Sequence, residues 1–196
     1  MSALTVLVIR HAEKPDPNDP DLGPGLTATG MEDKDSLVIR GWQRAGTRAA
    51  LFGAGMAGLD FPKPDIVYAA DPAQSSSREG FHSKRPFETI VALCNRLHIS
   101  PIIAHGVDDE VALVNEVQQL TGVVLIYWEH KRIVDAILPE LTKGQKLPHL
   151  PTRWDVTRFD VVLRFDRVQT GAPWSFRQLF PRLLTGDLDV PLSGKE

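Results

Sequence analysis

Two arginines and two histidines are the residues of this chain best suited to chemistry. Arg10 and His11 directly follow an apolar run at residues 4–9, and Arg85 and His130 come later in the sequence. A guanidinium group grips the oxygens of an anion such as phosphate, and a neutral imidazole can act as a nucleophile or a base. Together these residue types indicate a site for an anionic substrate.

The predicted secondary structure gives these residues a common location. Three apolar, β-branched runs are predicted as strands, at residues 4–9, 65–70 and 123–128. Arg10 and His11 follow the first run, His130 follows the third, and Arg85 begins a predicted helix at residues 85–97. Ligands of open α/β sheets bind outside the carboxyl ends of the strands. We therefore expect the four side chains to converge at one edge, where they would suit a dianionic phosphoryl group.

Strands and helices alternate along most of the sequence. A helix is predicted with Ser36 as its N-cap, and residues 101–105 predict a short additional strand. Two further strands, at residues 159–165 and 174–180, are predicted to form a hairpin through Gly171. The expected fold class is α/β: a three-layer sandwich with a mostly parallel sheet and helices on both faces, in a single domain over residues 1–196.

Composition and charge narrow the classes of partner. Of the 196 residues, 42% are hydrophobic and 24% charged, which is ordinary for a globular protein with one large core. The net charge of −3, with scattered basic residues, gives no electrostatic basis for binding nucleic acid. The first apolar run is too short to span a membrane, and it lacks the basic segment and cleavage site of a signal peptide. We expect a cytoplasmic protein without nucleic-acid or membrane partners.

Four motifs occur in an order that resembles the histidine phosphatase (phosphoglycerate mutase-like) superfamily. That family has a strand followed by Arg-His-Gly or Arg-His-Ala, a Leu…Gly…Gln-Ala helix start, a Ser-rich turn before an Arg with Thr four residues on, and a strand ending in a second His. The corresponding residues are Arg10-His11-Ala12-Glu13, residues 37–45, residues 75–77 before Arg85 and Thr89, and His130. Gln43 of the second motif lies one residue early. The resemblance covers about the first two-thirds of the chain.

The resemblance implies a phosphatase with His11 as its nucleophile. His11 would take the phosphoryl group as a phosphohistidine, Arg10, Arg85 and His130 would hold the phosphoryl oxygens, and water would release phosphate. His11 must be neutral at the attacking nitrogen, so its other ring nitrogen should donate to a backbone carbonyl. The implied substrate is a phosphorylated small molecule or a phosphohistidine protein, and no cofactor is implied.

The proton donor for the leaving group is less well specified. Many family members use a Glu or Asp that lies between the second Arg and the second His. Candidates in or near that interval are Asp108, Asp109, Glu110 and Glu13. The first three would equally suit the start of a helix, and Glu13 would equally suit a partner role for Lys14 or an Arg. Lys131 stands where some phosphatases of the superfamily have Asp. The chain is thus more similar to the small, minimal branch, whose phosphohistidine-protein phosphatases lack an obvious acid.

Two other functions are consistent with the same residues. A catalytically inactive phosphate-binding or scaffold module of this fold would keep the pocket without turnover. A metal-dependent hydrolase would need His105 to join His11 and Glu13 as ligands. No His-x-x-x-His pair and no pair of cysteines supports a metal site, so we expect no metal ligands.

Overall fold

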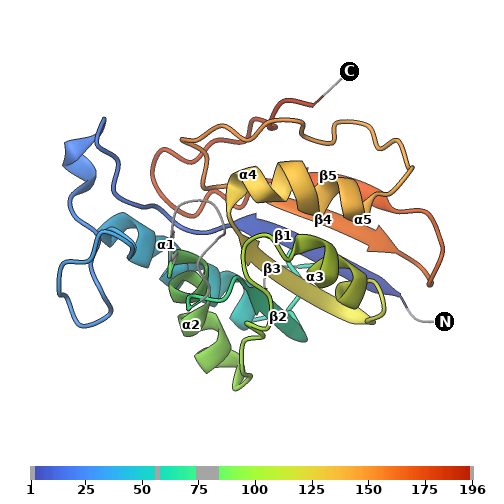
Figure 1. Ribbon diagram of the computed structural model, residues 1–196, viewed down its shortest axis with the longest axis horizontal. Coiled ribbons are helices and arrows are strands. Elements are labelled where there is room, and N and C mark those ends of the chain that lie inside the picture. Colours follow the sequence, from blue (N-terminus) through green and yellow to red (C-terminus); the bar gives the residue numbers. More distant parts are fainter. Residues whose placement is uncertain (1–2, 56–57, 74–83, 195–196) are drawn as a thin grey trace.

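A five-stranded sheet forms the centre of the computed structural model, which describes residues 3–55, 58–73 and 84–194 (Figure 1). Its strands are β1 (Leu4–Arg10), β2 (Ile66–Ala69), β3 (Gly122–Trp128), β4 (Val162–Arg167) and β5 (Ser175–Leu179), in the spatial order β2-β3-β1-β4-β5. β1, β2 and β3 are parallel, and β4 runs antiparallel to both β1 and β5. Four of the five strands thus point the same way, which confirms the predicted mostly parallel sheet and its C-terminal hairpin.

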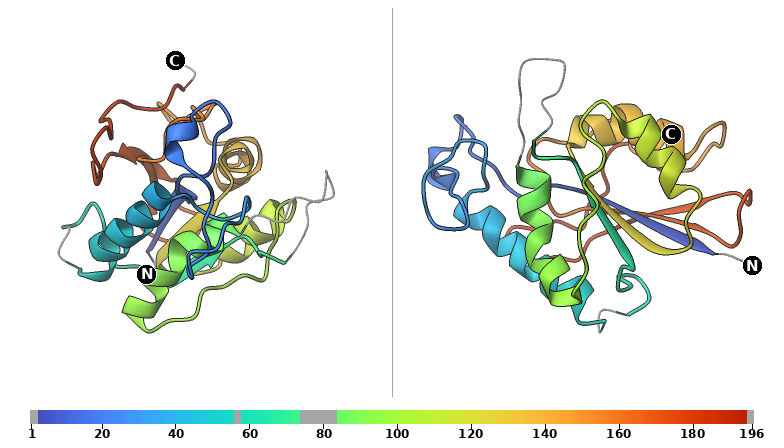
Figure 2. Two further views of the ribbon diagram at one scale, coloured as in Figure 1. Left: turned by 90° about the vertical axis from the view of Figure 1, so that its left-hand side faces the viewer. Right: turned by 60° about the horizontal axis from the view of Figure 1, so that its bottom comes forward.

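Helices cover both faces of this sheet (Figure 2). One face carries α1 (Ile39–Gly53) and α2 (Arg85–Leu97). The other carries α3 (Glu110–Val117) and a continuous helical segment of α4 (His130–Arg132), the π-helical turn η2 (Ile133–Ile137) and α5 (Leu138–Leu141). Side chains of β1 alternate between the two layers: Leu7 and Ile9 pack with α1 and α2, and Val6 and Val8 pack with the opposite layer. The α/β class with helices on both faces is therefore confirmed.

Two local predictions are wrong. Residues 101–105 form only an isolated parallel bridge, between Ile102 and Tyr68 of β2. Pro101 has no N–H to extend this ladder. Ser36 does not cap α1, which begins at Ile39 after Val38. The Ser36 hydroxyl instead donates to the Glu88 carboxylate of α2, a tertiary contact across 52 residues of sequence.

The C-terminal segment returns to the carboxyl edge of the parallel strands. Past β5 the chain brings Asp187 against Arg44 of α1, with 2.7 Å between Nη2 and Oδ1. A short 3-10 turn, η1 (Pro20–Leu22), lies in the loop that follows β1. Among the described helices, none combines the length and apolar character required to cross a membrane.

Candidate active site

The ends of β1 and β3 bring two of the predicted motifs together. Arg10, the last residue of β1, is paired with Trp128, the last residue of β3. The His11 backbone N–H then donates to the Trp128 carbonyl at 3.1 Å, so the two strands end level with each other. His130 follows Trp128 by two residues at the start of α4. Parallel pairing thus places the Arg10-His11 pair and His130 at one edge, as predicted.

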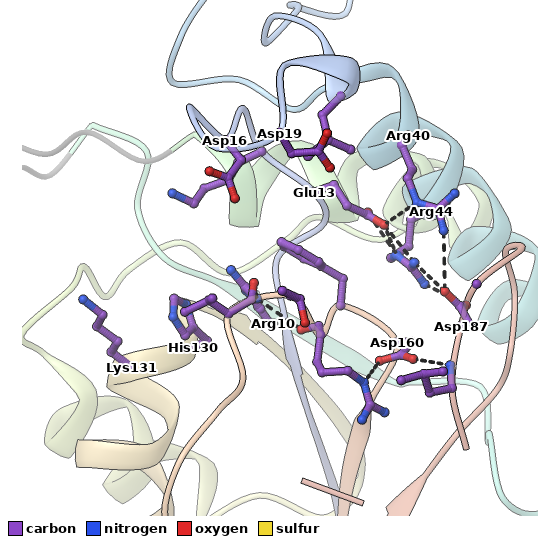
Figure 3. A pocket seen from close by; sticks show the side chains of 18 residues that line it. Arg10, Glu13, Asp16, Asp19, Arg40, Arg44, His130, Lys131, Asp160 and Asp187 are labelled. Carbon is purple, nitrogen blue, oxygen red and sulfur yellow. Dashed lines mark hydrogen bonds and ion pairs between the residues drawn. The ribbon is translucent and has the colours of Figure 1, made fainter. Parts of the chain in front are cut away.

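A cavity of about 500 Å³ opens at this edge (Figure 3). Arg10, His130 and Lys131 line one part of it, and Glu13, Arg40 and Arg44 line another. Its remaining walls come from the loop after β1 and from the segments around residues 156–160 and 186–188. Loops from the N-terminal and C-terminal parts of the sequence therefore surround a cavity rich in charged side chains.

The His11 ring is held in one tautomer. Its Nδ1 lies 2.7 Å from the carbonyl oxygen of Ala12, and a carbonyl can only accept a hydrogen bond. Nδ1 therefore carries the proton, and Nε2 keeps its lone pair. Burial, with the positive charges of Arg10 and Arg85, lowers the pKa of His11 well below the ordinary 6.5. This neutral ring with a backbone acceptor on Nδ1 is the state that the resemblance requires of a nucleophile.

An NMR titration of the imidazole nitrogens can check this state. We expect His11 to stay neutral and Nδ1-protonated as the pH is lowered through 6.5, because the folded pKa lies well below that value. The unfolded chain would bind a proton there and the folded chain would not, so His11 should make folding less stable as the pH falls below 6.5. In Arg10→Gln the ring pKa should rise, because one positive charge is gone. Protonation of wild-type His11 at pH 6.5 or above would contradict this interpretation.

Arg10 is fixed by backbone carbonyls rather than by a carboxylate. Its Nη1 donates to Val156 at 2.6 Å and to Arg158 at 3.1 Å, and its guanidinium carbon lies 3.7 Å from the centre of the Phe159 ring. Burial lowers its pKa to about 10. Its buried Nε has no hydrogen-bond partner among the described residues. A rigid guanidinium with an unused donor is suited to hold an oxyanion.

Arg85 and Thr89 connect α2 to the backbone beside His11. The Thr89 hydroxyl accepts from the Ala12 N–H at 3.0 Å and donates to the Arg85 carbonyl at 2.6 Å. Arg85 Nη2 donates to the backbone carbonyl of Lys34 at 2.8 Å, and its buried Nε has no partner in the part of the chain that the structure describes. Of the four predicted residues, Arg10 and His130 line the cavity, whereas Arg85 and the buried His11 do not. The charge of Arg85 nevertheless lowers the pKa of His11. The Ser-rich turn at residues 75–77 lies outside the described residues.

Thr89→Val tests whether this contact positions the loop that carries His11. Valine has nearly the same shape but leaves the Ala12 N–H without its acceptor, which costs about 2 kcal/mol of unfolding free energy. If the proposed activity below holds, turnover should fall about tenfold as the loop shifts. Urea denaturation and steady-state kinetics measure both effects. Thr89→Ser keeps the hydroxyl and should remain near wild type, and a Thr89→Val protein of unchanged stability would contradict the assigned role.

His130 lies against an ionised carboxylate. Its Nδ1 is 2.8 Å from Oε1 of Glu129, a close contact that becomes an ion pair only when the ring carries a proton on both nitrogens. Burial alone would raise the pKa of Glu129, but the contact with His130 and the backbone N–H groups of α4 hold it at about 2. Nε2 of His130 is buried without a partner among the described residues. Because His130 lines the cavity, this nitrogen is a candidate contact for a ligand there.

The carboxylates considered as proton donors are engaged elsewhere. Glu110 is buried and accepts from Trp128 and Arg132, whose Nη2 also lies 3.0 Å from Asp108. Asp109 accepts from the Gly106 N–H. None of these three acids lines the cavity.

Glu13 does line the cavity, but it is already bound to arginine. Both of its oxygens accept from Arg44 Nε, at 2.9 and 3.0 Å, and Arg40 lies 3.3 Å away. Glu13 therefore serves as an ion-pair partner of an arginine, which was the alternative to a proton-donor role. The structure thus brings no uncommitted carboxylate from the four candidates to the cavity.

Sequence reasoning missed four residues that shape the site: Lys14, Arg44, Arg48 and Asp187. Lys14 lines the cavity, and burial with the charges of Arg85 and Arg10 lowers its pKa. Arg48 of α1 donates to the backbone carbonyls of Arg10, at 3.0 Å, and of Phe159. Asp187 joins the Glu13–Arg44 pair. A usable signal existed for Arg48 and Arg44, which lie four residues apart on the apolar face of a predicted helix. Asp187 follows no regular pattern.

The considered metal ligands do not meet. His105 lies 2.7 Å from Glu116 of α3 and does not line the cavity that holds Glu13. Within residues 3–55, 58–73 and 84–194, no three His, Cys, Asp or Glu side chains gather as a possible ligand set.

Comparisons with known proteins support the architecture. No protein-family model matches the chain, and no curated protein matches its sequence. Among solved structures, the protein histidine phosphatase SixA, complexed with tungstate, matches with a TM-score of 0.51 and 15% sequence identity. The match covers 90% of this chain and 97% of that chain. At this identity the likeness shows that the two chains share a fold, the mixed α/β sandwich.

Proposed function

We propose that the protein is a phosphatase of the histidine phosphatase type, acting through a phosphohistidine on His11. The observation that carries the proposal is the buried, neutral His11 ring with Nδ1 bound to the Ala12 carbonyl and Nε2 left as the nucleophile. The shared fold with a protein histidine phosphatase supports the reaction class.

The reaction has two transfers. His11 Nε2 attacks phosphorus, the bond from phosphorus to the leaving atom breaks, and the leaving group keeps the electron pair and takes a proton from solvent water. Water then attacks the phosphohistidine, the P–N bond breaks, and phosphate leaves with His11 neutral again. The unused Nε donor of Arg10 and Nε2 of His130 would stabilise the phosphoryl oxygens through both steps, and the charge of Arg85 would act on the same centre through its field at His11.

Two carboxylates near the histidines are not placed as proton donors, which favours substrates whose leaving group needs little protonation. Glu129 has a pKa of about 2 and is ionised at neutral pH, and Glu13 is bound to Arg44. Neither is therefore placed as a proton donor. A phosphoramidate such as phosphohistidine on a protein, or a small phosphorylated molecule with a stable leaving group, fits this chemistry best.

Turnover of an aryl phosphate at mildly acidic pH, with and without a chelator, tests the proposal. We expect chelator-insensitive release of phosphate, and faster turnover of aryl than of alkyl phosphates. Chelator-sensitive turnover would favour a metal-dependent hydrolase. Absence of turnover with aryl phosphates and with a phosphohistidine peptide would favour the inactive phosphate-binding module.

A further inference from the structure

A second buried arginine site lies at the opposite edge of the sheet. β4 runs antiparallel to β1, so its last residue, Arg167, is paired with Leu4 at the start of β1. Figure 1 shows this end of β4 beside the beginning of β1, away from the end where Arg10 lies. Leu4 and Arg10 are six residue steps apart along an extended strand, a distance of about 20 Å. Arg167 therefore lies outside the candidate active site.

Arg167 is buried without a compensating acid among the described residues. Its exposed fraction is 7%, and burial lowers its pKa with no carboxylate of the described chain acting against it. The other buried arginines differ: Arg10, Arg44 and Arg48 each have carboxylates that raise their pKa, and Arg158 pairs with Asp160. An uncompensated buried charge is costly to a folded protein, so its presence calls for a partner.

The Arg167 guanidinium is held in place with a donor left over. Its Nη2 donates to the carbonyl of Gln118, and its guanidinium carbon lies 4.8 Å from the centre of the Trp174 ring. Its Nε is buried without a hydrogen-bond partner among residues 3–55, 58–73 and 84–194. The adjacent Asp166 is committed to Arg164 and Thr5. The Arg167 guanidinium is therefore held in a fixed position, but one of its hydrogen-bond donors has no acceptor among the described residues.

A cavity of about 480 Å³ adjoins this guanidinium. Arg167 and Lys143 are the charged residues in its lining, which contains no Asp or Glu. Gln145 secures one wall, because its amide both donates to and accepts from the backbone of Trp174, at 2.6 and 2.8 Å. Lys143 at the rim is exposed and pairs with Glu140. The cavity lining is thus positively charged, and hydrogen bonds hold one of its walls in place.

We propose that this cavity binds a small anion bearing a carboxylate or phosphate group, with the Arg167 guanidinium as its principal contact. Guanidinium matches both groups through paired N–H donors, and a desolvated charge binds its partner more strongly than an exposed one. The apolar surface of Trp174 and Pro173 would contact the rest of the ligand. This inference does not rest on the proposed phosphatase activity, because the two sites share no residue.

NMR titration with inorganic phosphate and, separately, with citrate tests the site and distinguishes its two possible ligand chemistries. We expect the Nε–H signal of Arg167 and the indole signal of Trp174 to shift and saturate with at least one probe. Arg167→Gln should weaken that binding by about tenfold or more, since it removes a charge-assisted contact. Signals from Arg10 report binding at the candidate active site separately.

A matched control separates this effect from general loss of positive charge. Arg164 lies on the same strand but pairs with Asp166 and does not line the cavity, so Arg164→Gln should keep the wild-type affinity. If Arg167→Gln fails to fold, Lys143→Gln should weaken binding about threefold, as expected for an exposed charge at the rim. Failure of both probes to give saturable shifts, or equal weakening by Arg164→Gln, would overturn the proposal.

Discussion

Replacing His11 with alanine should lower kcat/KM for an aryl phosphate by about 10⁴-fold or more, as expected when a covalent nucleophile is removed. The reason lies in the geometry of one ring. His11 Nδ1 is committed to the Ala12 carbonyl, so Nε2 is the atom that can bond to phosphorus. Arg10 and His130 would still bind the anion in the variant, so substrate or phosphate binding should survive the loss of turnover.

His105→Ala provides the control for this experiment. His105 is bound to Glu116 and lies outside the cavity, so the variant should turn over substrate at the wild-type rate. Steady-state kinetics measure turnover, and a phosphate titration followed by calorimetry measures binding. A His11→Ala protein that retains a tenth or more of the activity would exclude His11 as nucleophile.

Replacing Arg44 with methionine should remove about 3–5 kcal/mol of unfolding free energy. The Arg44 side chain is 3% exposed and lies between Glu13 and Asp187, which are 5% and 3% exposed. Its loss would leave two buried carboxylates facing each other, with the partly exposed Arg40 as their remaining cation. Because Glu13 and Asp187 line the cavity, its wall should loosen as well. Guanidinium denaturation measures the stability change.

Arg40→Met is the matched control, because Arg40 lies near the same two carboxylates. Its side chain is 36% exposed, at 3.3 Å from Glu13 and 3.9 Å from Asp187. Solvent-exposed ion pairs contribute about 1 kcal/mol or less, so this variant should be only slightly destabilised. If the two substitutions lower the unfolding free energy equally, the contribution of Arg44 to stability does not come from its burial between two acids.

The buried parallel strands and α2 were predictable because their signals are local. β1 and β3 are unbroken apolar runs, and α2 has the predicted bounds, with Pro86 in its first turn, where a missing N–H costs little. The N-terminus of α1 was not predictable in the same way. Ser36 has the residue type of a cap, but its hydroxyl binds Glu88, which is distant in sequence.

In the candidate site, too, some features could be predicted from the sequence and others depend on contacts between distant residues. Arg10, His11 and His130 lie at one edge of the sheet because parallel strands end there, a consequence of topology that the order of motifs already implies. The Arg44–Asp187 contact spans 143 residues and ends in an irregular segment, so no periodicity indicates it. The commitment of Glu110 to Trp128 and Arg132 likewise depends on how α3 packs against β3 and α4.

The central claim is a covalent phosphoryl group on His11, and trapping that group tests it most directly. The protein is incubated briefly with an activated phosphate donor, denatured under alkaline conditions that preserve phosphohistidine, and mapped by mass spectrometry. We predict an acid-labile phosphate on His11, absent from His11→Ala and present in His105→Ala. Label on His130 with none on His11, or turnover without any acid-labile label, would contradict the account.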